Sequence, residues 1–191
     1  MQEAVPVGVG AMAAILGLDL AAVQSVCEKA AEGQIVSPAN LNSPGQIAIA
    51  GNREAVERAV TIAKNDGAKR AILLQVSAPF HCALMMPAEQ RLAADLDACA
   101  FSDLRFPLIT NVDAQPIRTG AHARSGVQRQ VSRPVRWQET IERLLAEGVR
   151  TFVEIGPGKV LLGLIRSIDK SVTMLNAEDE KSMENALSAL L

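Results

Sequence analysis

The sequence predicts an α/β protein in two parts: a β-α-β-β-α-β unit over residues 1–77, then strands alternating with helices over residues 78–191. Short apolar runs of strand length alternate with segments whose apolar residues recur at helical spacing. Clusters of Gly, Pro, Asn and Asp separate these segments and predict turns. Hydrophobic residues make up 49% of the chain and charged residues 21%, so we expect a packed core rather than disorder.

The first unit begins with a strand, a helix and a hairpin. Residues 7–16 are small and apolar and predict the strand, and Asp19 then offers a side chain that caps a helix. The apolar positions that follow recur at helical spacing: Leu20, Val23, Val26, Cys27 and Ala30. Residues 35–41 and 46–50 read as two strands joined by a turn at residues 42–45, which predicts a short hairpin.

A second helix and a fourth strand complete this unit. Asn52 is expected to cap the helix, and Gly67 to end it. The apolar residues of the helix fall on one face: Ala55, Val56, Ala59, Val60 and Ala63. Residues 71–76 predict a buried strand. The resulting order of elements is typical of the ferredoxin-like fold, in which two helices cover one face of a four-stranded sheet.

Residues 78–191 show a different order of predicted secondary-structure elements. The expected elements are a helix over 85–99, a strand within 104–111, a polar connection over 113–126, a helix from Pro134 to Gly148, a strand over 149–155, a tight turn over 156–158, a helix over 159–168, a strand over 172–175 and a helix over 181–190. Apolar strands alternating with helices predict a parallel sheet covered on both faces. Because about three strands are few against the usual 5 to 6, we expect part of a domain.

Composition excludes several classes of partner. The net charge of −2 gives no reason to expect nucleic acid or an anionic membrane, and aromatic residues reach only 3%. No apolar run approaches the roughly 20 residues that span a bilayer. Cys27, Cys82 and Cys99 are odd in number and lack metal-site spacing, so we expect reduced thiols and a cytoplasmic protein.

His81 is the strongest candidate for chemistry. It follows an apolar strand and Pro79, which places its imidazole at the carboxyl edge of a sheet, where α/β active sites gather. A free imidazole titrates near neutrality and can take a proton from a hydroxyl and return it to a leaving group. The alternative is a half-buried histidine that caps the following helix. The residues alone leave both interpretations open.

Other candidate motifs favour ordinary structural roles. Cys82 is not expected to pair with His81, since neighbouring residues on an extended chain point to opposite faces. His122 lies in a polar stretch and is interpreted as a solvated side chain in a loop. Residues 156–159 (GPGK) lack the spacing of a phosphate-binding loop and predict a strand-turn-helix corner, although the helix N-terminus there could face an anion.

Five segments together resemble the malonyl-CoA:acyl carrier protein transacylase family. They are, in order, GVGAMAAILGL (8–18), NSPGQIAIAG (42–51), APFHCALM (78–85), QVSRPVRW (130–137) and EIGPGKVLL (154–162). The related acyltransferase domains of polyketide and fatty acid synthases share a looser version. The resemblance extends essentially from end to end, and it favours the catalytic interpretation of His81.

The resemblance implies a mechanism and a set of site residues. Family members pair a serine in a G-x-S-x-G elbow with the histidine at the position of His81, and pass a malonyl group from malonyl-CoA through an acyl-serine to the phosphopantetheine thiol of acyl carrier protein. The main-chain carbonyl at Gln130 is expected to accept the imidazole hydrogen bond. Phe80 matches a position that borders the acyl pocket, and Asn42 belongs to a loop that lines the cleft between two subdomains. Neither a metal nor a redox cofactor is implied.

The sequence departs from the family at the nucleophile. No G-x-S-x-G occurs in the 191 residues. The resemblance therefore covers the C-terminal portion of the family: a ferredoxin-like small subdomain (1–77) and the C-terminal part of a larger α/β-hydrolase-like acyltransferase subdomain (78–191). We expect the isolated chain to be inactive. The alternative is a shortened, non-catalytic homologue that binds acyl carrier protein or a partner subunit.

Overall fold

The computed structural model describes residues 1–190. They form two compact units, the first spanning Met1–Thr140 and the second beginning at Ile141. The sequence-predicted division between residues 77 and 78 remains a prediction. No helix in this described part of the chain is long and apolar enough to cross a membrane.

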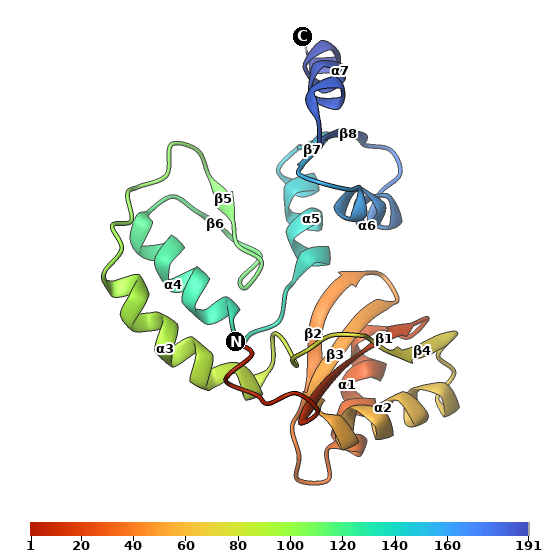
Figure 1. Cartoon of the computed structure of the whole chain (residues 1–191). Coiled ribbons are helices and arrows are strands. Elements are labelled where there is room, and N and C mark those ends of the chain that lie inside the picture. The colour runs from red at the N-terminus through yellow and green to blue at the C-terminus, as the bar shows by residue number, and fades with distance from the viewer. Residues whose placement is uncertain (191) are drawn as a thin grey trace. The chain divides into compact units, whose positions relative to one another are not determined.

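A four-stranded antiparallel sheet in the order β2-β3-β1-β4 forms the N-terminal half of the first unit (Figure 1). Its elements are, in chain order, β1 (Gly10–Leu16), α1 (Leu20–Ala31), β2 (Val36–Ser43), β3 (Gln46–Asn52), α2 (Arg53–Asn65) and β4 (Arg70–Leu73). The predicted β-α-β-β-α-β order is therefore present. The hairpin turn is tighter than expected, because Asn42 and Ser43 belong to β2 and only residues 44–45 turn the chain.

Alternation along the strands separates two apolar faces of this sheet. Ala13 and Ile15 of β1 pack in one cluster with buried residues of α1 and α2, so both helices cover the same face. The opposite face carries Met12 of β1 with Ala48 and Ala50 of β3. This second face packs against the residues around His81, so it positions the site described below.

The two predicted helix caps behave differently. The Asp19 side chain accepts a hydrogen bond from the Ala22 amide at 2.8 Å, as expected for an N-cap. Asn52 stands at the N-cap position of α2, but its Oδ1 accepts instead from the amide of Ile35 at 2.8 Å. The prediction of a side-chain cap at Asn52 is wrong because the unpaired Ile35 amide beside β3 takes that oxygen.

The fourth strand is shorter and more exposed than the sequence predicts. β4 ends at Leu73 rather than residue 76, and of its four residues only Ala71 is buried. Because β4 is the edge strand of the sheet, it has a neighbour on one side only. An apolar run can therefore indicate an edge strand as well as a central one.

Helices α3 and α4 lie side by side in the rest of the first unit (Figure 1). The elements here are η1 (Ala83–Met85), α3 (Met86–Asp97), β5 (Leu108–Ile109), β6 (Pro116–Ile117) and α4 (Gly120–Gln130), with α5 (Trp137–Ala146) after them. The predicted polar connection over 113–126 is wrong, since it contains β6 and most of α4. His122 accordingly lies in the first turn of α4, where it is exposed.

The segment before α5 pairs with the sheet. The predicted helix start near Pro134 is wrong, because α5 begins at Trp137 and the preceding residues are extended. Val135 forms a parallel bridge to Asn40, in which its amide donates to the Ala39 carbonyl and its carbonyl accepts from the Leu41 amide, both at 2.8 Å. This bridge ties the chain that follows α4 to β2.

The expected three-stranded parallel sheet does not form among the described residues. β5 pairs with β6 in an antiparallel ribbon of two residues each, and Ala114 between them adopts a left-handed φ of 53° that turns the chain back. In the second unit, β7 (Thr151–Ile155) and β8 (Thr173–Ala177) pair in parallel. Helices α6 (Val160–Ile168) and α7 (Glu180–Leu190) accompany them.

Candidate functional site

His81 lines a pocket of about 420 Å³ in the first unit, here called the His81 pocket. One wall is β5 with the residues after it, Leu108–Asn111, and the other is α4, which contributes Ala123, Gly126, Val127 and Gln130. The lining is mostly apolar. The pocket therefore places one imidazole beside a mostly apolar surface.

The loop that carries His81 is held by its own contacts. His81 adopts a left-handed φ of 61°, a conformation that costs a non-glycine residue about 1 kcal/mol or more. The buried Cys82 donates its Sγ hydrogen bond to the Pro79 carbonyl at 3.1 Å, and the Met85 amide donates to the Cys82 carbonyl at 2.9 Å. These bonds on both sides of His81 fix the direction in which its side chain leaves the backbone.

The imidazole is oriented by Gln130. His81 Nδ1 lies 2.8 Å from the main-chain oxygen of Gln130. A carbonyl oxygen only accepts, so Nδ1 carries the proton and Nε2 keeps a free lone pair. This is the tautomer that a general base needs at Nε2. The catalytic roles of His81 and Gln130 remain predictions.

The Gln130 carbonyl is available because α4 ends there. The last four carbonyls of an α-helix have no partner within the helix, and Gln130 is the last residue of α4. Such carbonyls carry the partial negative charge of the helix C-terminus. The oxygen is therefore free to accept from His81 Nδ1, and this contact orients the imidazole ring.

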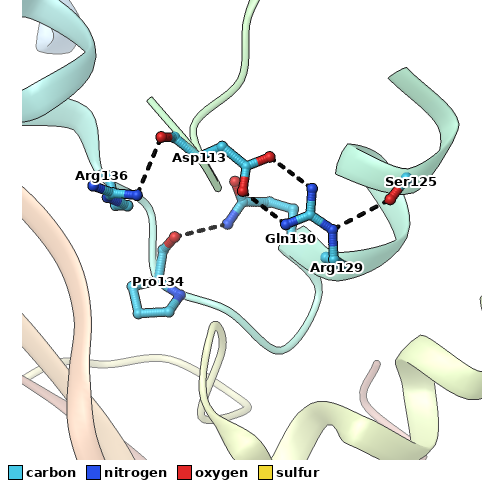
Figure 2. A network of polar contacts seen from close by, with 6 residues as sticks. All are labelled: Asp113, Ser125, Arg129, Gln130, Pro134 and Arg136. Atoms are coloured by element: carbon cyan, nitrogen blue, oxygen red, sulfur yellow. Dashed lines mark hydrogen bonds and ion pairs between the residues drawn. The ribbon is translucent and has the colours of Figure 1, made fainter. Parts of the chain in front are cut away.

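The Gln130 side chain holds the segment that follows α4. Its Nε2 donates to the carbonyls of Arg133 at 2.9 Å and Pro134 at 3.2 Å. Figure 2 shows the Pro134 contact within a larger network. The side chain thus faces the chain after the helix, while the main-chain oxygen faces His81.

An ion pair joins α4 to the turn between β5 and β6. Arg129 donates to both carboxylate oxygens of Asp113, at 2.8 and 2.6 Å, and Arg136 Nη1 donates to the Asp113 carbonyl at 3.1 Å (Figure 2). The hydrogen bonds from Arg129 lower the pKa of Asp113 from its ordinary value. Neither Asp113 nor Arg129 was predicted as a site residue from the sequence, and the only indication was that Arg129 directly precedes Gln130.

Phe80 and Asn42 lie apart from the His81 pocket lining. Phe80 is half-buried and packs against two core clusters, one of which contains Ala78 and Met85 and the other Met12 and Cys82. Asn42 is half-buried within β2. The structure therefore brings together His81 and Gln130, and the roles of Phe80 and Asn42 in substrate binding remain predictions.

The remaining sequence motifs have structural partners. Burial raises the pKa of the Cys82 thiol to about 11, which makes it a poor nucleophile at neutral pH. In the second unit, the Glu154 carboxylate accepts from the amides of Leu161 and Leu162, and Glu178 accepts from the Gly158 amide. Three of the amides near the start of α6 are therefore already paired with carboxylates of the chain. Among residues 1–190, no cluster of His, Cys, Asp or Glu is placed to hold a metal ion.

Comparison with known proteins gives a consistent result over nearly the whole chain. A family model described as acyl transferase domain matches residues 1–186. The chain is 49% identical over 187 residues to the malonyl CoA-acyl carrier protein transacylase of Escherichia coli strain K12, covering 98% of this chain and 60% of that protein.

Solved structures agree with the sequence comparison. The malonyl CoA-acyl carrier protein transacylase of Coxiella burnetii superposes with a TM-score of 0.96 at 45% identity, covering 99% of this chain and 60% of that one. A malonyl-transacylase in complex with its type II PKS acyl-carrier protein superposes with a TM-score of 0.95 at 47% identity, covering 98% and 61%. The chain thus spans about 60% of the length of these relatives.

Proposed function

The chain belongs to the acyl transferase domain family, and on that premise we propose that it forms the C-terminal portion of a malonyl-CoA:acyl carrier protein transacylase. Residues 1–77 correspond to a ferredoxin-like small subdomain, and the residues from 78 onward to the C-terminal part of the larger α/β-hydrolase-like subdomain. The strand order β2-β3-β1-β4 with both helices on one face supports the first assignment. The observation that carries the functional proposal is the His81 imidazole, held by a main-chain carbonyl at the edge of an apolar pocket.

His81 acts as the general base in the first half-reaction. Its Nε2 takes the proton of a serine hydroxyl, the serine oxygen bonds to the malonyl carbonyl carbon, and the carbon–sulfur bond to coenzyme A breaks. The proton then passes from Nε2 to the departing thiolate. Gln130 keeps the proton on Nδ1, so Nε2 is free to accept.

The second half-reaction reverses these roles. Nε2 takes the proton of the phosphopantetheine thiol of acyl carrier protein, and the thiolate attacks the acyl-serine carbonyl. The serine oxygen leaves and recovers the proton from His81. Malonyl-CoA and acyl carrier protein are therefore the two partners of the complete enzyme.

The nucleophile belongs to the part of the family that this chain does not span. No Ser in the sequence has the flanking glycines of a G-x-S-x-G elbow. Because base and nucleophile work as a unit, His81 alone supplies little of the rate enhancement. The isolated chain is therefore inactive, and Phe80 and Asn42 shape the acyl pocket and the cleft only in the complete enzyme.

A fusion tests this proposal. The segment of the Escherichia coli relative that precedes the matched region is joined to Met1, and malonyl transfer from malonyl-CoA to acyl carrier protein is followed by mass spectrometry. The fusion should transfer malonyl groups, whereas the separate chain should not. A folded but inactive fusion would contradict the assignment, and transfer by the chain alone that disappears in His81→Ala would contradict the missing-nucleophile argument.

A further inference from the structure

We propose that Asp113 and Arg129 are positioning residues for His81, and that their ion pair fixes the Gln130 main-chain oxygen against the imidazole. The contribution to catalysis rests on the proposed function, whereas the effect on the imidazole itself does not. Both residues act through Gln130 rather than by touching substrate. The pair joins two segments that each contribute residues to the walls of the His81 pocket.

The ion pair connects these walls directly. Asp113 lies shortly after β5 and the two residues that follow it, which together (Leu108–Asn111) line one wall, and Arg129 precedes Gln130 on α4, which forms another wall. Two hydrogen bonds join the guanidinium to both carboxylate oxygens, and Arg129 Nε also lies 3.3 Å from Ser125 Oγ, one turn earlier on α4 (Figure 2). A bidentate pair restricts both the distance and the relative orientation of its partners.

Further hydrogen bonds hold the segments next to Gln130, whose main-chain oxygen accepts from His81. From Asp113, the main-chain oxygen accepts from Arg136, and the Arg136 amide donates to the Asn111 carbonyl at 2.8 Å. The side-chain Nε2 of Gln130 donates to the carbonyls of Arg133 and Pro134. The end of α4, the turn after β5 and the segment before α5 are therefore linked to one another, with Gln130 O facing His81.

An isolated surface ion pair contributes little to the free energy of unfolding. The importance of this pair therefore depends on its position beside Gln130. Both side chains are 37% exposed, and exposed pairs contribute little to the free energy of unfolding. The ion pair is therefore expected to affect the geometry of the site more than the stability of the fold, to which it contributes only a small term. A displacement of about 1 Å in a catalytic group can reduce the rate by about 10²-fold.

The first test measures the imidazole itself. The chain is labelled with ¹⁵N-histidine, and long-range ¹H–¹⁵N spectra report which ring nitrogen carries the proton. The chain contains two histidines, and His122→Gln assigns the signals. Wild-type His81 should be protonated at Nδ1 when neutral, and Arg129→Met and Asp113→Asn should each mix the two tautomers. An unchanged tautomer in the folded variants would overturn the proposal.

A matched variant on the same helix controls for general effects. Arg124 on α4 also pairs with a carboxylate, that of Asp97 at the end of α3, but it stands six residues before Gln130 rather than next to it. Arg124→Met should leave the His81 tautomer unchanged. Equal tautomer mixing in Arg124→Met would contradict a specific role for Asp113 and Arg129. If Arg129→Met fails to fold, the milder Asp113→Asn still gives a decisive spectrum.

The second test uses the fusion enzyme. Arg129→Met should lower kcat by about 10- to 100-fold while KM for malonyl-CoA changes by less than about 3-fold, because orientation rather than binding is lost. Arg129→Lys keeps the charge without the bidentate geometry and should recover part of kcat. A change in KM alone would contradict positioning. Tautomer mixing in the chain together with an inactive wild-type fusion would overturn the proposed function and leave the positioning role intact.

Discussion

His81 Nδ1 and the main-chain oxygen of Gln130 lie 2.8 Å apart, across 49 residues of sequence. The acceptor is the main-chain carbonyl of the last residue of α4. Every residue type has a main-chain carbonyl, so the side chain at this position does not supply the acceptor. The orientation of the imidazole therefore depends on where α4 ends and how its end is held, rather than on the chemistry of one side chain. Substitution of Gln130 is therefore expected to have a different effect from substitution of His81.

Gln130→Ala should have a milder effect than removal of His81. The substitution keeps the carbonyl that accepts from Nδ1 but removes the two hydrogen bonds to Arg133 and Pro134. At about 0.5–1.5 kcal/mol for each bond, the free energy of unfolding should fall by about 1–3 kcal/mol. Urea unfolding measures this loss, and a fusion carrying Gln130→Ala should keep measurable transacylase activity. Activity as low as that of His81→Ala would show that the Gln130 side chain takes part directly.

The three cysteines should differ in reactivity. Burial raises the pKa of Cys27 to about 12 and that of Cys82 to about 11, whereas Cys99 is exposed. At pH 8 roughly one Cys82 side chain in a thousand is a thiolate, and the thiolate is the reactive form. Iodoacetamide followed by mass spectrometry should label Cys99 first, and Cys27 and Cys82 only in urea. Rapid labelling of Cys82 in the folded chain would contradict its low reactivity and would make a catalytic role for that thiol worth testing.

Gly51→Ala should destabilise the sheet. A Cβ at Gly51 in β3 would lie 2.0 Å from the main-chain oxygen of Ile35, a backbone atom that cannot move aside. We expect a loss of about 2 kcal/mol or more in the free energy of unfolding. Gly163→Ala in α6 is the matched control, because a Cβ there meets no described atom within 4 Å and alanine favours a helix. Equal losses in both variants would contradict this packing argument.

The Asp113–Arg129 pair should make stability depend on acid pH. The hydrogen bonds from Arg129 lower the pKa of Asp113 in the folded state, so the pair stabilises the fold above the ordinary carboxyl pKa of about 4. That contribution is lost as pH falls through the lower folded value. The difference in Tm between the wild-type chain and Asp113→Asn should therefore be small but positive at pH 7 and should shrink as the pH falls below the ordinary carboxyl pKa of about 4. A difference that does not change with pH would exclude an ionic contribution.

Local signals in the sequence predicted most of the elements correctly. Asp19 preceded a helix with apolar residues at helical spacing, and it caps that helix in the structure. The two strands of the hairpin form close to their predicted positions, and residues 173–177 form the last strand close to its predicted position. These features depend on interactions between residues that are close in sequence.

The errors arose where distant contacts decide the structure. α4 contains Gly120 and Gly126 and few apolar residues, so its apolar pattern does not predict a helix, although the Thr119 side chain caps it. A Cβ at Gly120 would lie 2.3 Å from the Phe101 carbonyl, and the Gly120 amide donates to Asp103. Close packing therefore requires glycine at that position. β5 was likewise expected in a parallel sheet, but the turn through Ala114 pairs it with β6.

The candidate site was predicted in part. His81 and Gln130 were identified through family resemblance, since the residue patterns alone left His81 open and gave no reason to select Gln130. The Asp113–Arg129 pair joins residues 16 positions apart through a turn and a helix that the sequence analysis did not predict. The position of this pair depends on the turn after β5, the end of α4 and the segment before α5. The residue spacing within any one of these segments does not predict it.

The rate of acyl-enzyme formation in the fusion tests the account most directly. Malonyl-CoA is mixed rapidly with wild-type and His81→Ala fusion enzymes, and the acylated serine is quantified by mass spectrometry. If Nε2 of His81 takes the serine proton, His81→Ala should slow acylation by about 10²- to 10⁴-fold, while His122→Ala leaves it unchanged. An unchanged acylation rate in folded His81→Ala would remove His81 from the mechanism.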